Sequence, residues 1–262
     1  GMKVFLGGAR GSWPVSGGDQ VKYGGDTFAL LAEGADGTQV LVDAGSGLRN
    51  LLERLRPGAT LFFTHTHLDH LIGLPLLAGE AWPRQLVSPR GGLPDILARV
   101  FSPPVWPVAL PAAETPVPRE PLTIGGLRLS WREVPHPDGC LACRVDEPAT
   151  GAAVVVATDI EWQAMSPDAQ ESFADFARAA DLLVFDAHFK PEEYAAHKGW
   201  GHSTWADALD AARRCGATQL WLMHHAPERT DAELDDMAAR AAAEFPGAVF
   251  ARAGVGREIL HE

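Results

Sequence analysis

Residues 64–70, Thr-His-Thr-His-Leu-Asp-His, constrain the fold of this chain more than any other segment. The apolar residues 60–63 precede them and predict a strand, so positions 65 and 67 point the same way and the following turn brings positions 69 and 70 beside them. Each of these polar side chains would need a partner inside a protein core. Imidazoles with one carboxylate suit zinc, manganese or iron better than calcium or magnesium. The segment therefore predicts a transition-metal site built from His65, His67, Asp69 and His70.

The same segment indicates more than one metal ion. A single ion takes three or four protein ligands, and four side chains this close in sequence cannot all reach one ion with good geometry. A second ion is therefore expected. Zinc is the favoured metal for both positions, with manganese or iron as alternatives. The missing ligands must come from other parts of the chain.

The hydrophobic pattern predicts an α/β protein whose strands lie in two halves of the chain, each flanked by helices. This arrangement fits a four-layer αββα sandwich made by a single domain of residues 1–262. The Pro-rich residues 102–121 cannot form a regular helix or a central strand, so we expect a long ordered loop near the site. The predicted strands are 4–6, 27–32, 39–43, 60–63, 127–134, 152–157, 182–185 and 219–223, and the predicted helices are 48–55, 167–180, 204–215 and 231–244.

Charge and composition limit the partners of this chain. The net charge of −12 argues against an extended nucleic-acid surface, which needs clustered Lys and Arg. A small anionic substrate remains compatible, because bound ions would dominate the local field. No apolar run approaches the roughly 20 residues that span a bilayer. We therefore expect neither signal peptide nor membrane anchor, and three cysteines, an odd number, favour a reducing cytoplasm. The sequence does not indicate an oligomeric state.

The HxHxDH pattern, intact at residues 65–70, resembles that of the metallo-β-lactamase fold superfamily. The resemblance implies the αββα sandwich and a site for two metal ions. It also implies that His136 completes the first metal site and that Asp159 bridges the two ions. The last ligand is His224 or His225, because adjacent strand residues point to opposite faces. The family position favours His224.

A second segment, Gly199-Trp200-Gly201-His202-Ser203-Thr204, resembles the ribonuclease Z and cyclic-nucleotide phosphodiesterase branch of this superfamily. The resemblance implies that His202 stabilises the transition state at phosphorus or protonates the leaving group, and that Asp69 also positions the attacking hydroxide. Ser203 or Thr204 is also a predicted N-cap of the following helix. These readings are compatible, because a capped helix fixes the direction of His202.

Three further groups have open roles. Asp186 and His188 either orient a ligating or catalytic histidine or form an exposed pair at a strand end. Residues 8–14 and 23–27 resemble elements of a bacterial group of unassigned hydrolases, in which Asn stands where this chain has Asp26. A carboxylate only accepts hydrogen bonds, so the role of that Asn is not carried over. The lone Cys140-x-x-Cys143 pair is expected to be structural.

The leading functional hypothesis is a metal-dependent phosphodiesterase that acts on a small nucleotide or another phosphodiester. A thioester or lactone hydrolase is the first alternative, because a metal-activated hydroxide also attacks carbonyl carbon. A di-iron redox or oxygen-sensing module is the second. The iron-dependent relatives replace a histidine of the first cluster by carboxylate ligands, whereas His65, His67 and His70 are all present here.

Overall fold

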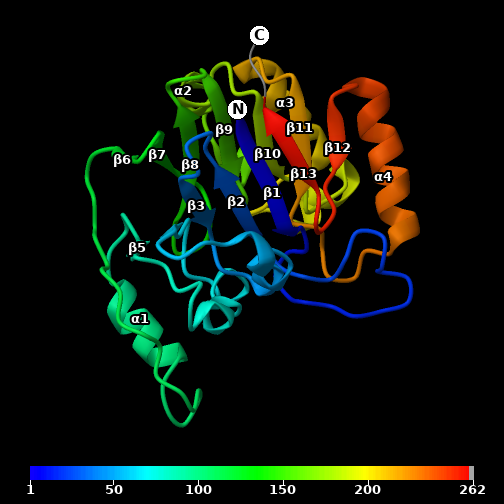
Figure 1. The fold of residues 1–262 in the computed structure, drawn as a ribbon. Helices are drawn as coiled ribbons and strands as arrows, with labels where there is room; N and C mark the ends of the chain where they lie inside the picture. The colour runs from blue at the N-terminus through cyan, green and yellow to red at the C-terminus, as the bar shows by residue number, and fades with distance from the viewer. Residues whose placement is uncertain (260–262) are drawn as a thin grey trace.

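The computed structural model describes residues 1–259, which form two β-sheets packed face to face with helices on their outer sides (Figure 1). The predicted αββα sandwich is therefore confirmed. The first sheet has the strand order β13(Gly256–Ile259), β1(Met2–Gly8), β2(Ala29–Glu33), β3(Gln39–Val42), β4(Thr60–Phe62), β5(Gln85–Val87). The second has the order β12(Ala248–Phe250), β11(Gln219–Met223), β10(Leu182–Asp186), β9(Ala152–Ala157), β8(Cys140–Glu147), β7(Leu127–Val134), β6(Leu122–Ile124).

Three apolar clusters fill the spaces between the layers. β9 contributes to two of these clusters, because all its residues are buried and its side chains point alternately to its two faces. Val154 and Val156 face the first sheet, whereas Val155 and Ala157 face the outer helices. A strand that is covered on both faces has a continuous apolar sequence, as β9 does. The third cluster lies between the first sheet and the short helices outside it.

Most of the candidate site residues lie at the ends of the parallel strands of the two sheets. β3 pairs with β4 in parallel, and β9, β10 and β11 run parallel to one another. The carboxyl ends of parallel strands meet at one edge, where open α/β sheets gather their functional groups. The candidate ligands and Asp186 lie at or just after strand ends of this kind, so the topology brings distant parts of the sequence together.

Three long helices cover the second sheet, and each begins at a cap. They are α2(Pro167–Phe176), α3(Trp205–Cys215) and α4(Asp231–Glu244). Thr204 caps α3 by accepting a hydrogen bond from the backbone of Asp207, as the sequence predicted for this position. α2 ends earlier than the predicted residue 180, because Ala177 leaves the helical path and Ala179 adopts a left-handed conformation with φ of 54°.

Other predictions of local structure were wrong. Residues 48–55 form no α-helix but two 3₁₀ turns, η1(Ser46–Asn50) and η2(Leu52–Arg54). Further 3₁₀ turns are η3(Leu68–His70), η4(Leu74–Leu77), η5(Trp162–Ala164) and η6(Pro191–His197). The sequence patterns also missed α1(Leu93–Val100) and the strands β5, β6, β8, β12 and β13. Except for β8, these strands have only three or four residues, too few for a clear alternation.

The Pro-rich residues 102–121 form an ordered loop, but they lie beside α1 and not at the site. With Trp82, Leu97 and Phe101 the loop lines an apolar groove of about 270 Å³. None of its residues lines the cavity next to His65 and His67. Within residues 1–259, no helix is long and apolar enough to cross a membrane.

Candidate metal centre

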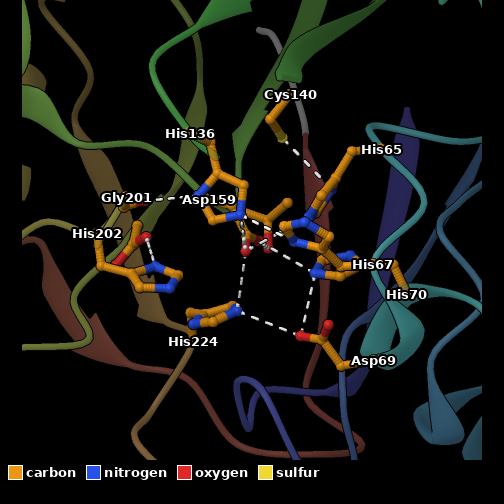
Figure 2. Close-up of polar contacts among 12 residues, drawn as sticks. His65, His67, Asp69, His70, His136, Cys140, Asp159, Gly201, His202 and His224 are labelled. Carbon is orange, nitrogen blue, oxygen red and sulfur yellow. Dashed lines mark hydrogen bonds and ion pairs between the residues drawn. The ribbon is translucent and has the colours of Figure 1, made fainter. Parts of the chain in front are cut away.

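Asp159 is the centre of a group of converging histidines (Figure 2). It lies two residues after β9 and is 2% exposed. Its Oδ2 is 3.2 Å from Nε2 of His224, 3.3 Å from Nε2 of His136 and 3.6 Å from Nε2 of His65. Its Oδ1 is 3.1 Å from Nε2 of His70. One carboxylate therefore faces four imidazole rings that come from both sheets.

The candidate ligands divide into two sets, and Asp159 lies close to members of both. In each set the candidate ligand atoms lie within 4.8 Å of one another. One set includes His67, whose Nδ1 is 3.2 Å from Nε2 of His136. The other includes Asp69, whose Oδ2 is 3.3 Å from Nε2 of His70 and 3.5 Å from Nε2 of His224. The sets are His65, His67 and His136, and Asp69, His70, Asp159 and His224, so the structure brings together all seven residues selected from the sequence.

The chemistry of these atoms fits divalent metal ions. The Nε2 atoms of His65, His70 and His224 are fully buried and have no hydrogen-bond partner among residues 1–259, although Asp159 is close by. The Nε2 atoms of His70 and His224 lie within hydrogen-bond distance of Asp159. They approach its carboxylate at angles that do not meet the geometry of a hydrogen bond. Buried polar atoms without partners are costly. Metal coordination would use these nitrogens, and imidazole with carboxylate is a donor set suited to zinc.

The electrostatics of the cluster favour added positive charge. Burial alone would raise the pKa of Asp159, yet His224, His70 and His65 hold it well below its usual range. Conversely, burial would lower the pKa of His224, but Asp159 raises it to about 10. The pKa of His70 rises well above its ordinary value despite its burial, because Asp69, Asp159 and Asp43 face it. The carboxylates thus stabilise cationic partners at this place, as a metal site must.

Asp43, which the sequence analysis did not select, fixes the orientation of His70. It follows β3 directly, and its Oδ2 accepts a hydrogen bond of 2.7 Å from Nδ1 of His70. The backbone N–H and the hydroxyl of Thr64 donate to the same carboxylate at 2.8 and 2.6 Å. With the proton held on Nδ1, Nε2 of His70 presents its lone pair to the cluster.

We expect Asp43→Asn to weaken metal binding by about 10- to 100-fold, the usual effect of removing a group that orients a ligand. Asp43 has φ of 60°, a conformation that Asn adopts readily, so the backbone should be kept. His70 and the Thr64 hydroxyl both donate to Oδ2, so an amide oxygen there would leave its NH₂ facing the backbone N–H of Thr64, which donates to Oδ1 in the wild type. Calorimetric titration of metal-free protein with zinc measures the effect, and an unchanged affinity would contradict this role for Asp43.

The other rings are also held at their second nitrogens or by close packing. Nδ1 of His136 donates to the carbonyl of Gly201 at 2.8 Å, and Nδ1 of His65 lies 3.0 Å from the hydroxyl of Thr64. Gly11 packs so closely on His224 that a Cβ atom there would lie 2.1 Å from Nδ1 of this ring. A side chain at position 11 would therefore displace His224.

The structure separates His224 from His225. His224 has φ of 64°, and its ring turns into the cluster next to Asp69 and Asp159. The ring of His225 lies elsewhere, stacked on Phe250 at 5.6 Å, and its Nε2 donates to the carbonyl of Ala251 at 2.8 Å. His225 is therefore a packing residue, and His224 is the member of the pair that can bind metal.

His202 lies at the edge of the cluster and is held by Asp186. Nδ1 of His202 donates to Oδ2 of Asp186 at 2.7 Å, and its ring stacks on that of His224 at 4.5 Å. Asp186 is fully buried, which rules out the exposed pair considered from the sequence. His188 is also buried, stacks on His202 at 4.5 Å and has its Nδ1 2.8 Å from the carbonyl oxygen of His224.

Asp26, Cys140 and Cys143 have structural environments. Asp26 accepts hydrogen bonds from Ser46, Arg49 and Asn50 and so ties its loop to η1. Cys140 and Cys143 are buried free thiols that point to opposite sides of β8, one into each of two apolar clusters. They cannot form a redox pair or share a metal ion in this fold.

The chain matches the family model described as beta-lactamase superfamily domain over residues 38–225. It belongs to this family. The match covers most of the chain, from β3 to His225, and includes the seven clustered residues. Proteins with this fold bind divalent metals and include hydrolases, so the family agrees with the donor set described above.

Several relatives of this chain are named ribonuclease Z. The chain is 22% identical to ribonuclease Z of Agathobacter rectalis, over 76% of this chain and 82% of that protein. Among solved structures, it superposes on the metallo-beta-lactamase fold protein YhfI from Bacillus subtilis with a TM-score of 0.72, 22% identity and coverage of 98% and 99%. It superposes on the short form of human tRNase Z with a TM-score of 0.70, 19% identity and coverage of 98% and 99%.

Proposed function

We propose that this protein is a phosphodiesterase that uses two divalent metal ions, preferably zinc, to hydrolyse a small phosphodiester. The observation that carries the proposal is the buried pair of His202 and Asp186 beside the metal cluster. Asp186 accepts the Nδ1 proton of His202, so Nε2 is the nitrogen left to face a substrate. A phosphodiester with a poor leaving group needs a proton donor at that place, more than a thioester does.

The ligands would hold one ion at His65, His67 and His136 and the other at Asp69, His70 and His224, with Asp159 between them. When bound, two such ions activate water for attack and offset the negative charge that develops on the phosphate oxygens. Asp69 would also orient the attacking group, because its Oδ2 is fixed by the backbone N–H of Ser12 at 3.0 Å. In its imidazolium form, with Nδ1–H donating to Asp186, His202 would donate the Nε2 proton to the leaving oxygen and become a neutral imidazole.

The remaining features support a small anionic substrate. The cavity beside His65 and His67 has a volume of about 190 Å³, and Arg90 is the cationic side chain that lines it. The overall charge of −12 disfavours a long nucleic acid, which needs many Lys and Arg contacts with phosphates. Several relatives are named ribonuclease Z, which supports attack at phosphorus rather than at carbonyl carbon. The expected location is the cytoplasm.

A substrate panel tests this function. We expect the protein loaded with zinc or manganese to hydrolyse bis-p-nitrophenyl phosphate and cyclic nucleotides faster than thioesters or lactones, measured as kcat/KM. Metal content is determined on the same samples after purification without added metal. Faster turnover of thioesters or lactones would overturn the phosphodiesterase. Bound iron with visible absorption and no hydrolysis of any ester would favour a di-iron redox protein.

A further inference from the structure

Trp200 is an exposed tryptophan two residues from His202. Its side chain is 61% exposed, so most of the indole surface is free to contact a bound molecule. Consecutive Cα atoms are about 3.8 Å apart, so the Cα atoms of Trp200 and His202 lie within about 7.6 Å. A tryptophan side chain is long enough to span this separation, so the position of Trp200 permits contact with a substrate at His202.

The backbone of this loop is fixed on both sides of Trp200. The N–H of Gly199 donates to Oε1 of Glu161 at 2.5 Å, and the N–H of Trp200 donates to the carbonyl of His197 at 3.1 Å. The carbonyl of Gly201 accepts the hydrogen bond from His136. Gly199 and Gly201 have φ of 87° and 90°, which permits this path. The loop that carries Trp200 is thus tied to the metal cluster.

The indole ring is also oriented, although it is exposed. It makes a T-shaped contact with the ring of His197, with a centroid distance of 4.8 Å and an interplanar angle of 90°. His197 in turn stacks on the buried ring of Phe189 at 4.6 Å and donates from Nδ1 to the carbonyl of Glu193. The three rings, Phe189, His197 and Trp200, run from the core to the surface. The other exposed tryptophan, Trp13, has no ring contact of this kind within residues 1–259.

Further exposed apolar side chains lie close in sequence to the cluster. Leu68 stands between His67 and Asp69, and Ile72 follows His70 by two residues. Loss of solvent contact by such side chains on binding is favourable, so the surroundings of the metal site can accept an apolar or aromatic group of the substrate. An oriented aromatic ring next to a phosphodiester site is the element that proteins use to stack nucleobases.

We propose that Trp200 stacks on a nucleobase of the substrate, so that the enzyme acts on nucleotide esters rather than on phosphodiesters in general. This proposal rests on the proposed function and narrows its substrate class. The indole face offers area without a hydrogen-bonding pattern, so it distinguishes substrates with a base from those without one and has little preference among bases. A protein partner at Trp200 is the competing interpretation.

Two esters with the same leaving group test the proposal: thymidine 5′-(p-nitrophenyl phosphate), which carries a base, and methyl p-nitrophenyl phosphate, which does not. We expect Trp200→Ala to lower kcat/KM for the thymidine ester about tenfold, the size of one base–aromatic contact, and to leave the methyl ester nearly unchanged. Trp200→Phe should retain most of the activity on both. The control is Val249→Ala on β12, which removes an exposed apolar side chain distant in sequence from the cluster and should change neither ester.

Equal losses on both esters, or no loss on either, would overturn the stacking proposal and leave the phosphodiesterase intact. A changed oligomeric state in Trp200→Ala with equal effects on the two esters would indicate a protein contact instead. If the wild-type protein hydrolyses neither ester, the proposed function fails. Calorimetric binding of thymidine 5′-monophosphate to the metal-loaded protein then tests stacking separately, and an affinity unchanged in Trp200→Ala would overturn it.

Discussion

Asp159→Asn is expected to lower phosphodiesterase activity by about a thousandfold and to reduce the metal content of the purified protein. Metal ions contribute several kcal/mol to stabilising a developing charge, and about 4 kcal/mol corresponds to a factor of about 10³ in rate. Among residues 1–259, Asp159 is the one carboxylate that faces His65, His70, His136 and His224. Asn has the same shape as Asp, but its NH₂ group would direct hydrogens at the surrounding histidine nitrogens, which need their lone pairs free to bind metal.

The matched control is Asp175→Ala on α2. This aspartate is exposed, and the ion pair it forms within the described part of the chain is with Arg178, an interaction that contributes little to stability. Both variants should keep the far-ultraviolet circular dichroism of the wild type. Metal analysis by mass spectrometry and kcat/KM for bis-p-nitrophenyl phosphate are measured on the same preparations. Full metal content with near-normal activity in Asp159→Asn would exclude Asp159 as a ligand between two ions.

The layers of the fold were predictable from local signals, and the cluster at the strand ends from these signals together with the resemblance of residues 65–70 to a known family. Strands such as 152–157 are apolar throughout, and polar residues follow within two positions of the strand end. Asp159 and His136 each stand two residues past a strand, so the strand-end rule places them together once the strands are known to run in the same direction. Asp43 carries the same signal directly after β3 and could have been selected in this way.

Contacts between distant segments could not be predicted in the same way. The carbonyl of Gly201 that orients His136 is a backbone group, and no side-chain pattern marks it. The choice between His224 and His225 depends on the positive φ of His224, which turns its ring away from the alternation of a strand. The Pro-rich loop was misplaced because its composition excludes regular structure but contains no information on which helix it packs against. The contacts by which the rings of Phe189 and His197 support Trp200 can be seen only in the structure.

The variant His202→Ala should show whether His202 acts as a proton donor or as a metal ligand. General acid catalysis typically contributes about 10²- to 10⁴-fold, so we expect a loss of kcat in this range on a diester whose leaving group is an alkoxide, such as a cyclic nucleotide. A p-nitrophenolate leaves without a proton, so bis-p-nitrophenyl phosphate should lose much less. Metal content should stay at the wild-type level, because His202 belongs to neither set of proposed ligands.

Asp186→Asn provides the graded comparison. Its amide oxygen can still accept from Nδ1 of His202, but a neutral amide forms a weaker hydrogen bond with a charged imidazolium than a carboxylate does. We expect a smaller loss than in His202→Ala, with the same dependence on the leaving group. Stopped-flow or steady-state kcat values for the cyclic nucleotide and the p-nitrophenyl ester provide the ratio. If kcat of His202→Ala falls equally for both substrates, the histidine stabilises charge on the phosphate instead of protonating the leaving oxygen. Near-normal turnover of the cyclic nucleotide would exclude both roles.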